Sequence, residues 1–82
     1  MERISVISST LKSIGYDPAS KTLEIEFLAK GPKQSVYTYH PVTAAEYAEL
    51  MTAPSIGGWF SAHIKNNLSI SYKRVETTEE TI

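Results

Sequence analysis

A capped helix start near the middle of the chain has the residue types and spacing best suited to ligand chemistry. Ser55 is expected to cap a helix that contains Gly57 and Gly58 in its first turn, and a lysine follows at position 65. Bare amides at a helix N-terminus can hold an anion, and glycine permits close approach. The pattern predicts a phosphate site at these amides, with the side chain of Lys65 or His63 nearby. The alternative, that the glycines only allow close packing of the helix, stays open.

Aromatic side chains form the second candidate. Tyr37 and Tyr39 alternate across Thr38, so they share one face of an expected strand. Paired rings on an open sheet face can stack nucleobases, and Trp59 can contribute in the same way. The opposite face, with Val36 and Thr38, is less apolar. The pattern therefore favours tyrosines that face inward and cover the core, with base stacking as the alternative.

Residues for metal binding or catalysis are sparse. The chain has two histidines, His40 and His63, and no cysteine. No carboxylate lies at ligand spacing from either histidine, and no nucleophile–base pattern is visible. We expect no metal, no cofactor and no enzymatic activity. The lack of cysteine excludes disulfides and suits the cytoplasm, and we expect neither a secretory leader nor a membrane span.

Charge is distributed unevenly along the 82 residues. The net charge is −1, but three acidic residues lie in 76–82, which is expected to be a disordered acidic tail. Residues 1–75 carry eight basic and six acidic side chains, a net charge of about +2, and are expected to form a single domain. This mild charge permits an anionic ligand such as RNA or a phosphorylated nucleotide without requiring one.

The elements that position these candidates follow from periodicity. Strands are expected at 11–16, 22–27 and 34–40, with turns at 17–20 and 30–33. Thr43 and Glu46 form a capping box that starts a helix ending before Pro54, and the helix capped by Ser55 is expected to stop at Asn66 and Asn67. The segment 68–72 is either a short strand or an extended return over the sheet.

These elements predict an α+β fold. It consists of a three-stranded antiparallel meander, with a fourth short strand left open, and two helices packed on one face.

The ordered set of these residues resembles the KTSC domain family over about residues 6–75. The resemblance rests on Ser8, Ser9, the run 14–17, the strand 23–27, the run 37–39, Val42, Tyr47, Leu50, Ala53, Ser55, Gly57, Phe60, Ile64 and Lys65. That family is named for its occurrence at the C-terminus of some lysyl-tRNA synthetases, and it also occurs as small stand-alone proteins in bacteria and phages. Two departures are a longer turn at 29–34 and the uncharged segment 66–70, where the family usually has a basic, aromatic stretch.

The resemblance implies RNA binding, suggested by the synthetase context and by Tyr37 and Tyr39. Together with the helix start, it favours a small non-enzymatic module that binds RNA or a nucleotide phosphate. The alternative is a protein-interaction or assembly module, in which exposed aromatic side chains or a free sheet edge pair with another chain, including a second copy of this one.

Overall fold

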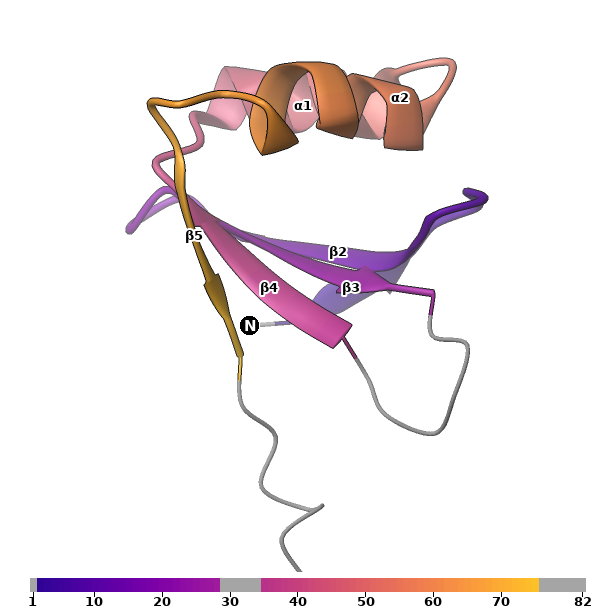
Figure 1. Cartoon of the computed structure of the whole chain (residues 1–82), viewed down its shortest axis with the longest axis horizontal. Helices are drawn as coiled ribbons and strands as arrows, with labels where there is room; N and C mark the ends of the chain where they lie inside the picture. Colours follow the sequence, from indigo (N-terminus) through magenta and orange to yellow (C-terminus); the bar gives the residue numbers. More distant parts are fainter. Residues whose placement is uncertain (1, 29–34, 76–82) are drawn as a thin grey trace, which may run out of the picture.

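The computed structural model describes residues 2–28 and 35–75, which form an α+β fold with helices on one side of an antiparallel sheet (Figure 1). The described residues form five strands, whose order in the sheet is their order in the chain. The strands are β1 (Arg3–Ser5), β2 (Leu11–Asp17), β3 (Thr22–Phe27), β4 (Ser35–His40) and β5 (Ser71–Arg74). The helical layer consists of α1 (Ala44–Thr52) and of α2 (Ile56–Phe60), which continues into the π-helical turn η1 (Ser61–Lys65).

The predicted meander is the centre of this sheet, and its three strands are confirmed as β2, β3 and β4. The described sheet has five strands, where three were predicted and a fourth was left open: β5 overlaps the segment 68–72 that was left open and extends one edge, and β1, which was not predicted, extends the other. β1 has only three residues, and all four residues of β5 are exposed, so neither has an alternating apolar pattern. The predicted turn at 30–33 and the predicted disordered tail at 76–82 lie outside the described residues.

Both predicted helix starts are confirmed. The Thr43 hydroxyl accepts a hydrogen bond from the Glu46 amide at 3.1 Å, and the Glu46 carboxylate accepts one from the Thr43 amide at 2.9 Å. The Ser55 hydroxyl accepts a bond from the Gly58 amide at 3.2 Å. These bonds satisfy amides that have no partner inside the helix. The second helical run ends at Lys65, directly before the predicted stop at Asn66.

The core lies between the helical layer and the face of the sheet that the helices cover. Leu23 and Ile25 of β3 are fully buried, and Phe60 and Ile64 are each only 1% exposed. Burial of a large apolar side chain stabilises the fold by about 1.5–3 kcal/mol, so these few residues provide most of the stability of a small domain.

Tyr16 connects the sheet to α1. Its ring stacks on Tyr47 with centroids 4.7 Å apart, and its hydroxyl donates a 2.5 Å hydrogen bond to the carbonyl of Val42. Desolvation, followed by the nearby carboxylates of Glu46 and Asp17, raises the pKa of the Tyr16 hydroxyl above its ordinary value. The hydroxyl therefore stays protonated and remains a donor at neutral pH.

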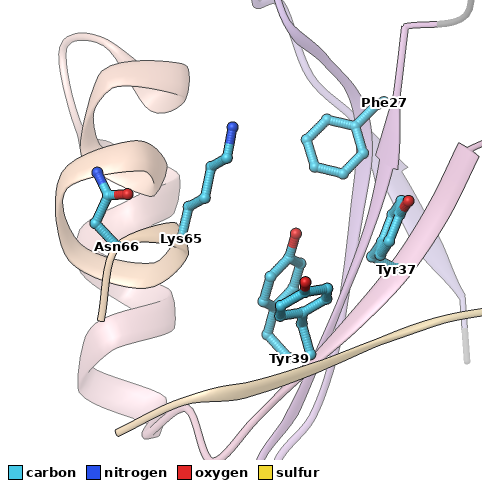
Figure 2. A pocket seen from close by; sticks show the side chains of 6 residues that line it. Phe27, Tyr37, Tyr39, Lys65 and Asn66 are labelled. Atoms are coloured by element: carbon cyan, nitrogen blue, oxygen red, sulfur yellow. The ribbon is translucent and has the colours of Figure 1, made fainter. Parts of the chain in front are cut away.

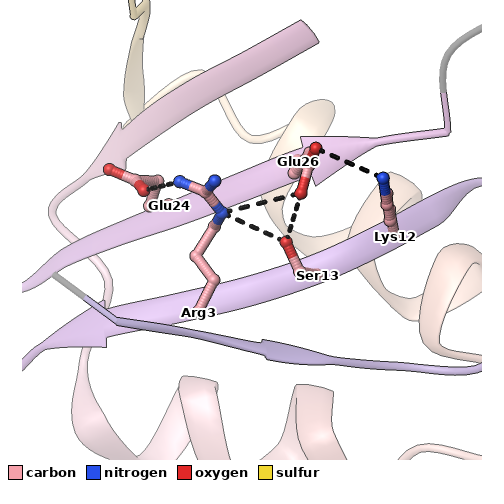
Figure 3. A network of polar contacts seen from close by, with 5 residues as sticks. All are labelled: Arg3, Lys12, Ser13, Glu24 and Glu26. Carbon is pink, nitrogen blue, oxygen red and sulfur yellow. Dashed lines mark hydrogen bonds and ion pairs between the residues drawn. The ribbon is translucent and has the colours of Figure 1, made fainter. Parts of the chain in front are cut away.

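The other face of the sheet carries a polar network (Figure 3). The carboxylate of Glu26, a residue only 5% exposed, accepts a 2.8 Å hydrogen bond from the Ser13 hydroxyl and lies 3.9 Å from the Lys12 ammonium. Arg3 donates from Nε to Ser13 at 3.1 Å and forms an ion pair with Glu24. In this network the basic side chains of Arg3 and Lys12 lie beside the acidic side chains of Glu24 and Glu26, so opposite charges compensate one another.

An irregular register in the β2–β3 pairing explains why neighbouring residues reach one carboxylate. The pairing shifts between positions 11 and 13, so Lys12 and Ser13, which regular alternation would place on opposite faces, both contact Glu26. The register also aligns Arg3, Gly15 and Glu24 across three adjacent strands. Glycine has no side chain, so the arginine can extend over β2 to the carboxylate on β3.

Candidate functional site

The helical run from Ile56 to Lys65 has a pocket at each end. Lys65 and Asn66, at its C-terminal end, line one pocket, and Ser55, Gly57 and Gly58, at its start, line the other. A run of this length extends about 15 Å at 1.5 Å per residue. The structure therefore does not place the glycine amides and Lys65 in one site, contrary to the prediction from the sequence.

The first pocket, here called the aromatic pocket, opens between the C-terminal end of this helical run and the sheet. Its volume is about 400 Å³, and its lining consists of Phe27, Tyr37, Tyr39, Lys65, Asn66 and Tyr72. Figure 2 shows Lys65 and Asn66 on the helical side, with Phe27 and Tyr37 on the strands across from them. The pocket thus combines aromatic walls with a cation and a side-chain amide.

Strand pairing explains the gathering of the rings. Tyr37 and Tyr39 lie on the helix-covered face of β4, as the sequence predicted, and Tyr39 is directly opposite Tyr72 on β5. The Tyr39 ring packs edge-on against Phe60 with centroids 5.1 Å apart, which fixes it to the core. Phe27 makes similar edge contacts with Phe60 at 5.7 Å and with Tyr37 at 5.8 Å. The pocket floor is therefore held by the core itself.

Exposure rises from the pocket floor to its rim. Tyr39 is 6% exposed, Tyr37 is half-buried, and Tyr72 is 70% exposed. The Tyr72 ring lies 6.2 Å from each of the other two rings, at tilts of 51° and 34°. The prediction that the tyrosines face inward is confirmed, yet Tyr37 and Tyr72 still offer ring surface to a flat ligand.

The aromatic pocket presents hydrogen-bond donors and positive charge to a ligand. Burial, followed by the neighbouring Tyr37 and Tyr72, raises the pKa of the Tyr39 hydroxyl to about 12, so it stays neutral. Lys65 lines the pocket, and Arg74 lies opposite Tyr37 on β5, two residues from Tyr72 and on the same face of the strand. Among the described residues, no acidic side chain is part of the lining.

The second pocket, here called the hydroxyl pocket, has a volume of about 430 Å³. It is lined by Ile7, Ser8, Ser9, Thr10, Ala53, Pro54, Ser55, Ile56, Gly57 and Gly58. Its polar groups are hydroxyls and backbone amides, and no lysine or arginine lines it. An anion there would meet neutral donors alone.

The glycines of the hydroxyl pocket have a packing explanation. A Cβ at Gly57 would lie 3.3 Å from the hydroxyl oxygen of Ser8 and 3.4 Å from that of Thr10, and a Cβ at Gly58 would lie 3.0 Å from that of Ser55. Glycine at position 57 therefore lets the helix approach the β1–β2 loop, and at position 58 it leaves room for the cap. Close packing accounts for both glycines without a ligand.

Trp59 and His63 lie outside both pocket linings. They are one helical turn apart, and their rings stack with centroids 4.5 Å apart and a tilt of 31°. Trp59 is half-buried and packs against the core, whereas His63 is exposed. Of the predicted residues, the structure thus gathers Tyr37, Tyr39 and Lys65 in one pocket and Ser55, Gly57 and Gly58 in the other.

Four residues in or beside the aromatic pocket were not among the predicted ligand-binding residues. They are Phe27, Asn66, Tyr72 and Arg74. Phe27 and Asn66 were assigned only structural roles, in a strand and at a helix stop. Tyr72 and Arg74 join the site through the pairing of β5 with β4, and the weak alternation of residues 68–72 did not define that pairing. The alternation of Tyr72 with Arg74 was the signal available in the sequence.

Two further kinds of feature are absent from the described part of the chain. No three histidine or acidic side chains in it come together in a group that could hold a metal ion. None of its helices is long and apolar enough to cross a membrane.

Comparison with known proteins agrees with the resemblance seen in the sequence. The family model of the KTSC domain matches residues 7–68. An uncharacterized protein of Stutzerimonas stutzeri is 35% identical over 65 residues, which cover 79% of this chain and 86% of that protein. The crystal structure of a KTSC domain protein from Yersinia pestis is 33% identical and superposes with a TM-score of 0.80, covering 92% of this chain and 97% of the other. The chain therefore belongs to the KTSC domain family.

Proposed function

We propose that this chain is a non-enzymatic cytoplasmic module that binds RNA or a nucleotide phosphate. The observation that carries the proposal is the aromatic pocket, where the half-buried Tyr37 and the exposed Tyr72 line the same cavity as Lys65. A nucleobase can stack on a tyrosine ring with a gain of about 1–3 kcal/mol per base. The phosphate on the ribose of that nucleotide would then lie within the field of the lysine.

The hydroxyl pocket offers a second phosphate contact in this proposal. The amides of Ile56 and Gly57 lie in the first helical turn and have no partner inside the helix. The hydroxyls of Ser9 and Thr10 line the same pocket. Because only neutral donors are present, we expect a phosphate to bind more weakly there than beside Lys65.

A binding role is supported over catalysis by where the bases lie. Neither His40 nor His63 lines the aromatic or the hydroxyl pocket. General base catalysis requires the base within hydrogen-bond reach of the group that it activates. The serine and threonine hydroxyls of the hydroxyl pocket have no such base in its lining.

The test is an NMR titration of backbone amides with inorganic phosphate, a mixture of nucleotides and a short single-stranded RNA at low salt. The proposal expects shifts at Tyr37, Lys65 and Tyr72 that weaken as salt is added. Shifts confined to Ile56–Trp59 would move the site to the hydroxyl pocket. Absence of shifts with all three probes would refute nucleotide binding.

A protein-interaction or assembly module is the second candidate. It is favoured by large apolar side chains that the described fold leaves exposed, among them Ile4 on the β1 edge, Ile7 in the β1–β2 loop and Tyr72 on the β5 edge. Exposed sheet edges can pair with another chain. Sedimentation velocity over a range of concentrations distinguishes the two functions, because association through apolar side chains is insensitive to salt and needs no nucleotide.

A further inference from the structure

We infer that the aromatic pocket takes one mononucleotide, a single base with its own phosphate, and does not bind a stretch of RNA strand. The inference rests on the proposed function and narrows its ligand class. It follows from three properties of the described residues: the size of the pocket, the placement of the cations around it, and the state of its hydroxyl groups.

The size of the pocket matches a small ligand. Its volume of about 400 Å³ lies at the lower end of the range of about 300–1,000 Å³ that is typical of small-molecule sites. Strand β4 supplies the floor through Tyr37 and Tyr39, and the helix end supplies the opposite wall through Lys65 and Asn66. One nucleotide, with its base, ribose and phosphate, is of a size that this space can hold, whereas a strand needs a longer surface with repeated stacking positions.

The cations near the pocket are sufficient for one phosphate. Lys65 lines it, and Arg74 lies on the same face directly opposite Tyr37. A phosphate monoester carries a charge of about −1.5 to −2 at neutral pH, which two cations complement.

The other four described cations are not part of the pocket lining, and one of them, Lys21, lies in the turn between β2 and β3. Arg3 and Lys12 are on the opposite face of the sheet, where they pair with Glu24 and Glu26. Lys73 lies beside Arg74 but points to that opposite face, because successive strand residues alternate. Binding of a strand requires several neutralised phosphates, and among the described residues only Lys65 and Arg74 are placed to neutralise one at this pocket.

The hydroxyl groups of the pocket are available to a ligand. Within the described residues, the hydroxyls of Tyr37, Tyr39 and Tyr72 have no hydrogen-bond partner. Each is both a donor and an acceptor, so they can bind phosphate oxygens and base edges alike. The Asn66 amide adds a second group with both capabilities. A ligand with one flat ring system and one compact anion uses all of these groups together.

The experiment measures the affinities of the intact chain for AMP, UMP, adenosine, and the octamers of adenylate and uridylate, at about 50 and about 200 mM salt. We expect at least one mononucleotide to bind, and adenosine to bind about tenfold more weakly than AMP. The affinity for AMP should fall as salt is raised, because screening weakens the attraction between the phosphate and the two cations, whereas the affinity for adenosine should change little. The affinity of each octamer, divided by its number of nucleotides, should lie within about threefold of the affinity of the corresponding mononucleotide.

Charge variants test the placement. Lys65→Gln and Arg74→Gln should each weaken AMP binding by about fivefold and leave adenosine binding unchanged. Lys73→Gln is the matched control, because it removes the same charge from the adjacent residue on the other face, and it should leave both affinities unchanged. Tyr72→Ala should weaken AMP and adenosine binding alike by about tenfold. Amide spectra of each variant establish that it is folded.

Two results would overturn the inference in distinguishable ways. An octamer that binds about 100-fold more tightly than its mononucleotide, with a slope of log affinity against log salt steeper than about −3, would make the protein a strand binder and leave the proposed function intact. Absence of binding by every nucleotide and octamer would refute the proposed function, and the inference with it. Equal losses from Lys73→Gln and Arg74→Gln would refute the assigned phosphate position.

Discussion

The buried carboxylate on the open face of the sheet provides a quantitative test of the structure. Replacing Ser13 by alanine removes the hydroxyl that donates to Glu26 at 2.8 Å and accepts from Arg3 at 3.1 Å. Glu26 itself is only 5% exposed, so water cannot readily replace the lost donor. The ion pair between Arg3 and Glu24 does not involve the hydroxyl and should persist.

The expected loss of stability follows from these contacts. Hydrogen bonds to charged groups contribute about 1.5–3 kcal/mol, and the ion pairs that Glu26 forms with Arg3 and Lys12 are longer contacts, at 3.8 Å and 3.9 Å. We therefore expect Ser13→Ala to lower the free energy of unfolding by about 2 kcal/mol. For a domain of this size, whose total stability is about 4–12 kcal/mol, that corresponds to a fall in Tm of about 8–16 °C.

Urea and thermal unfolding, followed by the fluorescence of Trp59, the single tryptophan, measure the change. Ser5→Ala is a matched control, because Ser5 is the cross-strand neighbour of Ser13 in β1 and is exposed. It should change stability by less than about 0.5 kcal/mol. A loss from Ser13→Ala that is equally small would refute the reasoning, since Glu26 would then not depend on this hydroxyl.

Three further outcomes are expected. Gly57→Ala should lower the free energy of unfolding by about 1 kcal/mol, although alanine has the better helix propensity. The reason is that the new Cβ would push on the Ser8 hydroxyl, which accepts hydrogen bonds from two amides. In a double-mutant cycle measured by urea unfolding, this loss should disappear in a Ser8→Ala background. Thr43→Ala should cost about 1 kcal/mol by loss of the capping box, with helix content by circular dichroism as the readout. Because burial raises the pKa of Tyr39 from 10 to about 12, the neutral hydroxyl of Tyr39 should contribute fully to folding stability below pH 10, and this contribution should be lost as the pH rises to 12. The absorbance of tyrosinate measures this ionisation, and Tyr39→Phe should remove the last ionisation step. A stabilising Gly57→Ala, an unchanged Thr43→Ala or an ordinary titration of Tyr39 would contradict the respective explanation.

Local chemistry in the sequence accounted for most of the helical layer and for the central strands. The capping box at Thr43 and the cap at Ser55 depend on residues three positions apart, so they are visible without the fold. The strand Thr22–Phe27 has strict alternation and was predicted with its observed bounds. The inward orientation of Tyr37 and Tyr39 followed from the same period of two.

The candidate site was harder to predict because it depends on pairing between distant segments. β5 meets β4 after two helices, and none of its side chains is buried, so no apolar pattern marks it. Tyr72 and Arg74 therefore could not be assigned to the site from their neighbours. The separation of Lys65 from Gly57, in contrast, follows from helix geometry alone, because the π-helical run carries the lysine to the far end.

The order of the strands has a consequence for how this domain folds. β2 and β3 are joined by four residues, whereas thirty residues separate β4 from β5. For flexible connections, closing the longer one costs about 2 kcal/mol more in chain entropy, and contacts between distant segments form late. We therefore expect β5 to pair with β4 only after β2, β3 and β4 have paired with one another, since it has little buried surface to hold it. Since β5 carries Tyr72, the aromatic pocket would be completed only when β5 pairs with β4. A ligand bound in the aromatic pocket would therefore slow amide hydrogen exchange in β5 more than in the other strands.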